Sequence, residues 1–427
     1  MKLLTLFIQK TEFLGLAIQE LLSLCRVCEI PTDNLFPNEP QITQAQYPFL
    51  APSDFTTFPF VYINIPEDCK PKLQDLLDRA ISIERFATVI AEGSSQSAFI
   101  ENLKANFSIL EPEVEDLSTY SFDIKTHLKK YTPAEKENLV VEMDVPMFKA
   151  KCDLKNPQRV FYLIENHSLE TGLKMKYLAK DIFSTRRHKP FATKYRLSDR
   201  IFLGPTSTDA ELSFLMCNQG LVTKGKWVYD PFFGTGSIMV AASHFGAFCV
   251  GCDIDIRVLL GYAVGKLNKN SAYFPHLKPE DKINVYLNFK QYGLALPEIL
   301  RTDSGSLNFL YNNLFDAIVC DPPYGIRAAP RQQGQREGKG NELKIGDEDY
   351  CIPTKKSTCY EITDKLFELG RKNLKQGGRL VFLFPVLLEA DPLEHFRDVE
   401  GFKLVAASKN RLNNKTYARY LFTFEKI

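Results

Sequence analysis

The residues most able to do chemistry form a short turn, Asp321-Pro322-Pro323-Tyr324, at the end of an apolar run. Proline has no N–H group, so the turn offers a carboxylate and backbone carbonyls as acceptors beside one aromatic face. Such acceptors suit a planar aromatic amine, because they return electron density to a nitrogen whose lone pair is delocalised into its ring. The four residues are therefore candidate catalytic residues for transfer of a group to an amine. Asp and Pro also end many strands, so the motif alone is equally consistent with a structural turn.

A glycine turn earlier in the chain has the form of a cofactor site. The strand-like run Trp227–Asp230 leads into Pro231–Ser237 (PFFGTGS), and an apolar helical stretch follows. Glycines let the backbone bend tightly and approach a ligand, and the first N–H groups of the helix can bind a carboxylate or phosphate. The candidate cofactor residues here are Asp230, Phe232, Gly234, Thr235 and Gly236.

An acidic residue also follows the next apolar strand, Phe248–Cys252. Asp253 lies about twenty residues past the glycines, where ribose hydroxyls are usually held. We take Asp253 as the first choice for that contact, with Ile254 beside it in the cofactor site. The glycine turn lacks the third glycine of the dinucleotide fingerprint, which disfavours NAD and favours a smaller adenosine cofactor. S-adenosylmethionine is the natural candidate.

Three motifs together carry a resemblance to a known family. Asp230–Ser237, Asp253–Asp255 and Asp321–Tyr324 resemble the cofactor and catalytic motifs of amino-group methyltransferases with a Rossmann-like fold. More narrowly, the chain resembles the tRNA guanosine-10 N2-methyltransferases, and the similarity extends through Tyr195–Asn218. It covers the C-terminal half well and the N-terminal half loosely.

The resemblance implies an activity, a cofactor and partners. It implies methylation of the exocyclic amine of a guanosine in tRNA by S-adenosylmethionine, together with a small zinc-binding activator subunit. It also places Thr206 in the cofactor site and Asp303 against the adenine amine of the cofactor. Read from the sequence alone, Asp303 is also consistent with a turn or a helix cap.

Composition bounds the class of protein. A chain of 427 residues suggests two or three domains. The sequence contains no run of about eighteen apolar residues, which argues against a membrane span. The apolar run Leu3–Ile8 is soon interrupted by charged residues, which argues against a secretory signal. The ten cysteines follow no disulfide-framework pattern, which fits a reducing compartment and a cytoplasmic location. The pairs Cys25/Cys28 and Cys249/Cys252 lack matching second pairs, so we expect no metal site in this chain.

One segment is strongly basic although the formal net charge is only +1. Residues 174–200 contain nine Lys and Arg residues against two Asp residues, with aromatic side chains interleaved. Such segments give nucleic acids salt-dependent phosphate contacts without base specificity, although an ordinary solvated linker has the same composition. The candidate RNA-binding residues are Arg186, Arg187, Lys189, Lys194 and Arg196, with Arg327 after the catalytic motif.

These observations predict the organisation of the chain. Residues 1–170 form an N-terminal, THUMP-like α+β RNA-binding region, residues 171–200 a basic linker, and residues 201–427 a methyltransferase domain. The last is α/β, with a mostly parallel seven-stranded sheet closed by an antiparallel C-terminal hairpin. Within the N-terminal region, the pattern predicts a helix running from Lys70 toward Ala91.

Three other functions use similar motifs. DNA amino-methyltransferases share the acceptor turn, although here the glycine turn precedes it and a long N-terminal region precedes both. Protein-glutamine methyltransferases usually carry Asn at the position of Asp321. A non-catalytic RNA-binding scaffold with a decayed cofactor fold is disfavoured by the intact glycines and the intact acceptor turn.

Overall fold

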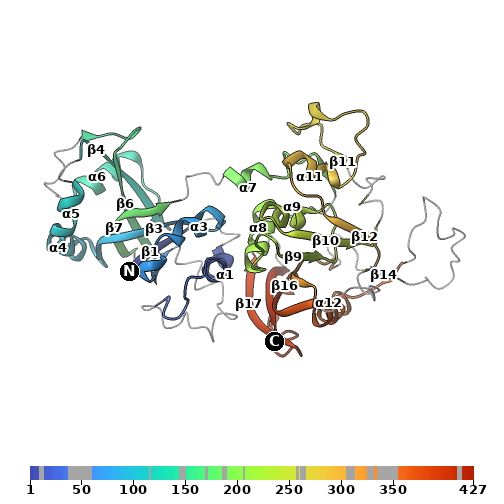
Figure 1. The fold of residues 1–427 in the computed structure, drawn as a ribbon. Helices are drawn as coiled ribbons and strands as arrows, with labels where there is room; N and C mark the ends of the chain where they lie inside the picture. The colour runs from blue at the N-terminus through green and yellow to red at the C-terminus, as the bar shows by residue number, and fades with distance from the viewer. Residues whose placement is uncertain are drawn as a thin grey trace, which may run out of the picture. The chain divides into compact units, whose positions relative to one another are not determined.

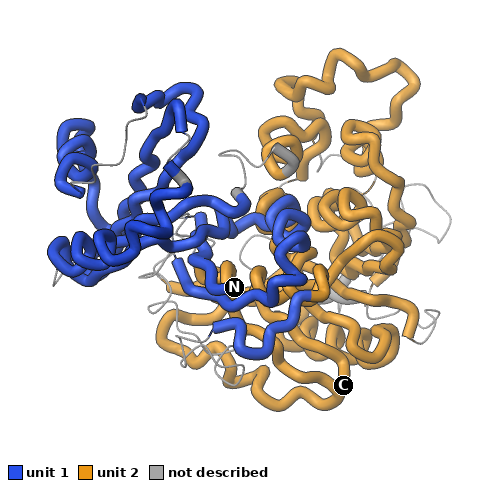
Figure 2. Tube along the Cα trace, turned by 60° about the vertical axis from the view of Figure 1, so that its left-hand side comes forward, with its two compact units in different colours: residues 1–10, 30–43, 51–187 blue, residues 11–29, 44–50, 188–427 orange. Residues whose placement is uncertain are grey.

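The chain divides into two compact units in the computed structural model (Figure 2). An N-terminal unit comprises residues 1–10, 30–43 and 51–187, and a C-terminal unit comprises residues 11–29, 44–50 and 188–427. None of the helices in the described parts of the chain is long and apolar enough to cross a membrane. The structure describes residues 1–8, 14–36, 60–114, 117–143, 151–168, 172–184, 190–204, 207–255, 259, 266–303, 313–324, 331–333, 354–410 and 416–427.

The N-terminal unit is built on a seven-stranded sheet in the order β2-β1-β3-β7-β6-β4-β5 (Figure 1). Apolar side chains form one cluster around Phe99, Leu103 and Phe161 and a second around Leu4 and Phe60. The strands are β1 (Lys2–Phe7), β2 (Phe60–Asn64), β3 (Ile83–Gly93), β4 (Thr119–His127), β5 (Lys151–Cys152), β6 (Arg159–Ser168) and β7 (Gly172–Ser184). The helices are α3 (Lys72–Arg79), α4 (Gln96–Ala105), α5 (Phe107–Val114) and α6 (Pro133–Val141), with a 3-10 turn at Glu67–Cys69.

The helix predicted from Lys70 toward Ala91 is wrong in its second half. Helix α3 ends at Arg79, and Ile83–Gly93 form β3, which pairs with both β1 and β7. The leucines of α3 recur at helical spacing, whereas β3 is rich in β-branched residues that favour the pleated backbone. The apolar content continues across Ala80, so only the change of period marks the boundary.

The basic segment expected to be a linker is in part a sheet strand. Residues 172–184 form β7, which pairs with β3 and β6 in the middle of the sheet. The side chain of Lys176 is fully buried, with Nζ 3.3 Å from Oε1 of Glu165 and donating to Oε1 of Gln96 at 2.8 Å. Lys176 is therefore a core cation, and it is not available to a phosphate group.

Glu165 is the acceptor at the centre of this polar cluster. Besides Lys176, the hydroxyl of Tyr131 donates to Oε2 of Glu165 at 2.7 Å, and Nε2 of His167 lies 2.9 Å from the same oxygen. Burial raises the pKa of Glu165, but the hydrogen bonds from Tyr131 and His167 and the charge of Lys176 outweigh burial. The net pKa of Glu165 is lowered, so its contribution to stability exists above about pH 4.5 and is lost as the pH falls further.

Tyr131→Phe is therefore expected to destabilise the N-terminal unit by about 2 kcal/mol at pH 7, because it removes a hydrogen bond to a buried charge. The loss is expected to shrink as the pH falls well below 4.5 and Glu165 takes up a proton. Hydrogen exchange of the β6 amides in the full chain measures the free energy of opening at both pH values. The same loss at both would contradict this account of the cluster.

The C-terminal unit contains a second seven-stranded sheet, in the order β12-β10-β9-β13-β16-β18-β17 (Figure 1). All neighbours from β12 to β16 pair in parallel, and β18 runs antiparallel between β16 and β17. This topology confirms the predicted α/β methyltransferase fold and its closing hairpin. The strands are β9 (Trp227–Asp230), β10 (Phe248–Asp253), β12 (Glu298–Arg301), β13 (Phe315–Cys320), β16 (Leu374–Leu387), β17 (Phe402–Asn410) and β18 (Tyr417–Lys426).

Helices cover this sheet, and two small two-stranded sheets accompany it in the described residues. β8 (Phe202–Leu203) pairs with β11 (Lys266–Leu267), and β14 (Arg331–Gln333) pairs with β15 (Thr354–Lys356). The inner strands are buried along almost their whole length, as expected of parallel strands with helices on both faces. The helices are α7 (Pro190–Lys194), α8 (Ala210–Gln219), α9 (Ser237–His244), α11 (Tyr286–Tyr292) and α12 (Cys359–Asn373), with a 3-10 turn at Phe274–His276.

One helix of the C-terminal unit comes from the beginning of the chain. A 3-10 turn (Leu14–Leu16) and α1 (Ala17–Val27) lie in the C-terminal unit although β1 precedes them in the N-terminal unit. The buried carboxylate of Glu20 accepts a hydrogen bond from Nδ2 of Asn218 in α8 at 2.8 Å. Arg26 forms an ion pair with Glu425 of β18. Helix α1 is thus an integral part of the C-terminal unit.

Candidate active site

The candidate site residues lie at one edge of the C-terminal sheet. Strand β9 lies between β10 and β13, and all three run in parallel, so their carboxyl ends share an edge. Asp230 ends β9, Asp253 ends β10, and Asp321 directly follows β13. Asp303 follows β12, the next strand beyond β10. Open α/β sheets bind ligands at this edge, at the point where the strand order reverses.

The glycine turn (Pro231–Ser237) has the backbone that the sequence predicts. Gly234 and Gly236 have φ angles of +52° and +77°, in the left-handed region that other residues rarely adopt. A Cβ atom at Gly236 would lie 2.9 Å from the ring of Phe233 and 3.2 Å from that of Phe289. Gly236 also directly precedes α9, so the helix begins immediately after the glycine turn.

Asp253 ties the end of β10 to the glycine turn. Its Oδ2 accepts a hydrogen bond from the N–H of Gly234 at 2.8 Å, and its Oδ1 accepts one from the N–H of Asp255 at 2.8 Å. Burial raises the pKa of Asp253 to about 6, against the opposing effect of these backbone hydrogen bonds. The side chain of Ile254, next to it, is partly exposed.

Three carboxylates share this edge of the sheet. The side chain of Asp230 is buried and accepts a hydrogen bond from the N–H of Phe232 at 2.9 Å. Burial raises the pKa of Asp230 well above its usual value, and the charges of Asp253 and Asp321 raise it further. A concentration of buried negative charge is relieved by a positively charged ligand. The residues present therefore fit S-adenosylmethionine, which carries a sulfonium, an ammonium group and ribose hydroxyls.

Thr235 connects the glycine turn to the segment before α8. Its Oγ1 lies 2.8 Å from Oγ of Ser207, and its backbone carbonyl accepts from Nδ2 of Asn288 at 3.1 Å. A Cβ atom at Gly204 would lie 2.7 Å from Cγ2 of Thr235, so the two segments pack without a gap. Thr206 lies outside the described residues.

The acceptor turn (Asp321–Tyr324) is held by two residues that sequence reasoning missed. Oγ1 of Thr208 donates to Oδ2 of Asp321 at 3.3 Å. Nη1 of Arg419, in β18, lies 3.7 Å from the same carboxylate oxygen and donates to the hydroxyl of Tyr324 at 3.3 Å. Burial raises the pKa of Tyr324 to about 12. Thr208 falls within the segment of family resemblance, but no local signal marks Arg419.

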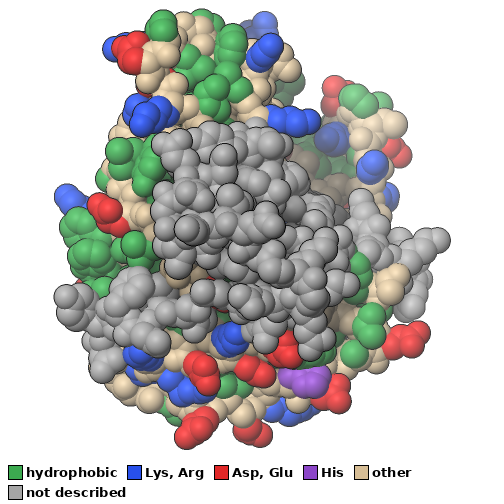
Figure 3. Space-filling view, turned by 90° about the vertical axis from the view of Figure 1, so that its right-hand side faces the viewer, with side chains coloured by type: hydrophobic (Ala, Val, Ile, Leu, Met, Phe, Trp, Pro, Cys, Tyr) green, Lys and Arg blue, Asp and Glu red, His purple; other side chains and the backbone are tan. Residues whose placement is uncertain are grey.

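The predicted RNA contacts are placed only in part. The side chains of Lys194 and Arg196 are exposed, on and just after α7. Arg200, a cation of the same segment, is fully buried and donates to Oγ of Ser237 at 2.5 Å, so it supports the start of α9. On the face shown in Figure 3, Lys and Arg side chains alternate with Asp and Glu side chains over the described surface. The other candidates, Arg186, Arg187, Lys189 and Arg327, lie outside the described residues.

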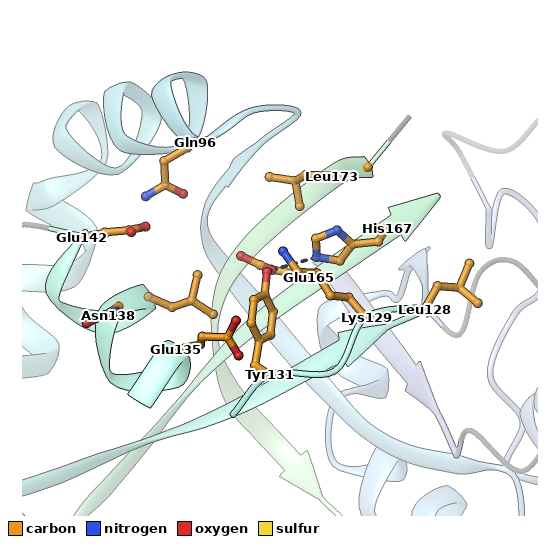
Figure 4. A pocket seen from close by; sticks show the side chains of 12 residues that line it. Gln96, Leu128, Lys129, Tyr131, Glu135, Asn138, Glu142, Glu165, His167 and Leu173 are labelled. Carbon is orange, nitrogen blue, oxygen red and sulfur yellow. Dashed lines mark hydrogen bonds and ion pairs between the residues drawn. The ribbon is translucent and has the colours of Figure 1, made fainter. Parts of the chain in front are cut away.

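A separate pocket of about 670 Å³ lies within the N-terminal unit (Figure 4). Its lining includes Lys129, Tyr131, Glu135, Glu165 and His167. The carboxylate of Glu165 is already engaged by Tyr131, His167 and Lys176. Because the pocket contains none of the candidate catalytic or cofactor residues, it is distinct from the candidate active site.

Two family models match parts of the chain. Residues 198–336 match the model of the RMKL-like methyltransferase domain, and residues 53–187 match that of the Tmrp11 THUMP N-terminal domain. A solved structure, TrmN from Thermus thermophilus, covers 100% of both chains at 17% identity with a TM-score of 0.46.

Curated relatives extend over most of the chain. The tRNA (guanine(10)-N(2))-methyltransferases TRMT11 of Mus musculus and Homo sapiens are each 30% identical to it, and each match covers 86% of this chain and 80% of the relative. That of Dictyostelium discoideum is 30% identical over 88% of this chain and 74% of the relative. Identity at this level over so much of both proteins establishes that the chain belongs to the TRMT11 family of tRNA (guanine(10)-N(2))-methyltransferases.

Proposed function

We propose that this chain is the catalytic subunit of a tRNA methyltransferase that transfers a methyl group from S-adenosylmethionine to the N2 amine of guanosine 10. The observation that carries the proposal is the pair of turns at neighbouring strands: the acceptor turn after β13 and the glycine turn after β9. One turn suits an aromatic amine and the other an adenosine cofactor. Membership of the TRMT11 family supports guanosine 10 as the target.

The cofactor residues surround the glycine turn. When bound, S-adenosylmethionine supplies an electrophilic methyl group on a sulfonium. Asp253 accepts from the ribose hydroxyls, and the left-handed Gly234 and Gly236 allow the backbone to approach the ligand closely. The remaining residues proposed for this site are Asp230, Phe232, Thr235, Ile254, Asp303 and Thr206.

The acceptor turn prepares the amine. The carboxylate of Asp321 and the carbonyl of Pro322 accept the two amine hydrogens and fix the direction of the nitrogen lone pair, while Pro323 shapes the turn. Tyr324 stacks on the guanine ring. Positioning supplies most of the acceleration. A carboxylate with a pKa of about 4 is too weak a base to deprotonate a neutral aromatic amine. It is adequate once the nitrogen becomes cationic, so the proton reaches Asp321 during or after methyl transfer.

The rest of the chain selects the RNA. We assign tRNA binding to residues 1–170 apart from α1, which the match to a THUMP N-terminal domain supports, and phosphate contacts to basic residues of 171–200 other than the buried Lys176 and Arg200. Residues 201–427 then form the methyltransferase domain. The proposed phosphate contacts are Lys194 and Arg196, together with Arg186, Arg187, Lys189 and Arg327.

We also propose a small zinc-binding activator as partner, acting with this chain in the cytoplasm. Trp227 and Phe248 support a protein partner, because their rings lie together with centroids 5.2 Å apart and an angle of 33° between their planes, while Trp227 is 37% and Phe248 56% exposed. Exposed apolar patches of this kind are typical of protein contact sites. Both residues stand at the amino ends of their strands, the edge opposite the candidate active site.

Methyl transfer from labelled S-adenosylmethionine tests the function. The purified chain, with and without a candidate activator, is offered unmodified tRNA, the same tRNA with adenosine at position 10, duplex DNA and protein. We expect N2-methylguanosine at position 10 of the first substrate alone, and faster transfer with the activator. Label in DNA or glutamine would favour a rival methyltransferase, and failure to bind the cofactor in the presence of the activator would favour a scaffold.

A further inference from the structure

We propose that Arg419 is a positioning residue of the acceptor turn, with two separable effects: it keeps Asp321 ionised and it fixes the ring of Tyr324. The inference rests on the proposed function, because it assigns Asp321 and Tyr324 to the amine. It adds a residue from the last strand of the sheet to a site otherwise built from β9, β10, β12 and β13.

The strand pairing holds Arg419 in place. It lies in β18, one strand from the edge of the sheet, where it is paired with Pro385 of β16 on one side and Asn410 of the edge strand β17 on the other. Its side chain is 15% exposed, and that of Asp321 is 20% exposed. A largely buried, paired strand position leaves the guanidinium little freedom to move away from the acceptor turn.

One guanidinium nitrogen serves both partners. Nη1 of Arg419 lies 3.7 Å from Oδ2 of Asp321 and donates to the hydroxyl of Tyr324 at 3.3 Å. The hydroxyl anchor fixes the end of the Tyr324 ring, whereas stacking on a base needs only the face of the ring. The hydroxyl is therefore used to orient the ring.

The charges around Asp321 explain why a cation is needed there. Asp230, at the end of β9, faces the same site and disfavours a second negative charge. Tyr324 and Cys320 on its own segment add no positive charge, and Thr208 offers one neutral hydroxyl. Burial lowers the pKa of Arg419, but the interactions with Tyr324 and Asp321 outweigh burial and raise it. Arg419 is thus a permanent cation that favours the ionised carboxylate.

Two substitutions separate the effects. Arg419→Lys keeps a positive charge but loses the rigid, planar guanidinium that fixes the direction of the N–H groups on Nη1. Arg419→Gln loses the charge as well. Tyr324→Phe keeps the stacking face and loses the hydroxyl, which interacts with both Arg419 and Asp321. Arg379→Gln is the matched control, because Arg379 is also a buried arginine on this sheet, paired with Glu425.

The experiment measures kcat and KM for tRNA across the pH range, using the full chain with its activator. For Arg419→Gln we expect kcat to fall about 100-fold. We also expect the acidic limb of the plot of kcat against pH to move up by about one pH unit. For Arg419→Lys we expect a fall of about tenfold with the limb unmoved, and no further fall when Tyr324→Phe is added. Arg379→Gln is expected to lower the thermal midpoint without moving the limb.

A second readout needs no turnover. Carbon-13 NMR titration of the Asp321 carboxyl in the full chain is expected to move to higher pH in Arg419→Gln and to stay in place in Arg419→Lys. An unmoved titration in Arg419→Gln, or kcat losses that merely follow thermal stability as in Arg379→Gln, would overturn the role of Arg419. If the wild-type chain methylates no tRNA, the proposed function fails, and the titration still decides whether Arg419 controls the carboxylate.

Discussion

Asp321→Ala is expected to lower the rate of methyl transfer by at least about 1000-fold while the affinity for S-adenosylmethionine changes less than about threefold. The carboxylate acts on the amine and not on the cofactor, so its loss removes an acceptor that matters most as positive charge develops on the nitrogen. Single-turnover rates with saturating tRNA give the first quantity, and titration calorimetry with the cofactor gives the second. Asp321→Asn keeps one acceptor oxygen without charge, so its rate of methyl transfer is expected to lie between those of the wild type and Asp321→Ala.

Asp316→Asn is the matched control for this experiment. Asp316 lies on the same strand, β13, near its other end, where it accepts from the backbone N–H of Trp227 at 2.9 Å and pairs with Lys375. Its substitution is expected to lower stability and to leave the rate within about twofold of the wild type. A similar rate loss in both variants, or a rate for Asp321→Ala above about a tenth of the wild type, would remove Asp321 from the chemistry.

Asp253→Ala is expected to weaken cofactor binding about 100-fold and to lower turnover much less at saturating cofactor. The substitution removes the proposed ribose acceptor and also leaves the N–H groups of Gly234 and Asp255 without their carboxylate partner. The glycine turn then loses both the proposed contact with the ligand and the hydrogen bond that ties it to the end of β10. Titration calorimetry of the full chain measures the dissociation constant. Asp281→Ala is the control, because Asp281 is a partly buried aspartate that likewise accepts from a backbone N–H, that of Lys278 at 3.0 Å.

The same residue predicts a pH dependence. The pKa of Asp253 is raised to about 6, so its ionisation destabilises the ligand-free chain as the pH rises through 6. Ribose hydroxyls prefer the ionised acceptor, so cofactor affinity is expected to fall as the pH drops from 7.5 to 5. Asp253→Asn should remove this dependence. Equal losses of cofactor affinity in Asp253→Ala and Asp321→Ala would contradict the division of roles between the two turns.

The sequence predicts those parts of the site that depend on local pattern. The glycine turn, the acid after β10 and the acceptor turn each follow a short apolar strand, and the parallel sheet then brings their ends to one edge. The fold class follows from the same alternation of strands and helices. These features could be read because each is encoded within a few consecutive residues.

Other features depend on which distant strands pair. Arg419 meets Asp321 only because β18 inserts next to β16, and no motif around it encodes that neighbour. In the sequence, nothing distinguishes Lys176 from the other cations of its segment. It is buried because it lies opposite Glu165 in the paired strands β6 and β7. Apolar residues continue through Ala80 and Ile81 between α3 and β3, so the boundary shows only in the change of spacing and in the β-branched residues of β3.

The placement of α1 has a consequence for how the protein is made. This helix is synthesised before its partners in α8 and β18, and β18 follows all the other described strands of its sheet in the sequence. Until then the nascent polypeptide must carry the apolar face of Leu21 and Leu24 without the surface that covers it. The C-terminal unit therefore cannot be completed before β18 is synthesised. A translation product that ends before β18 cannot assemble this unit.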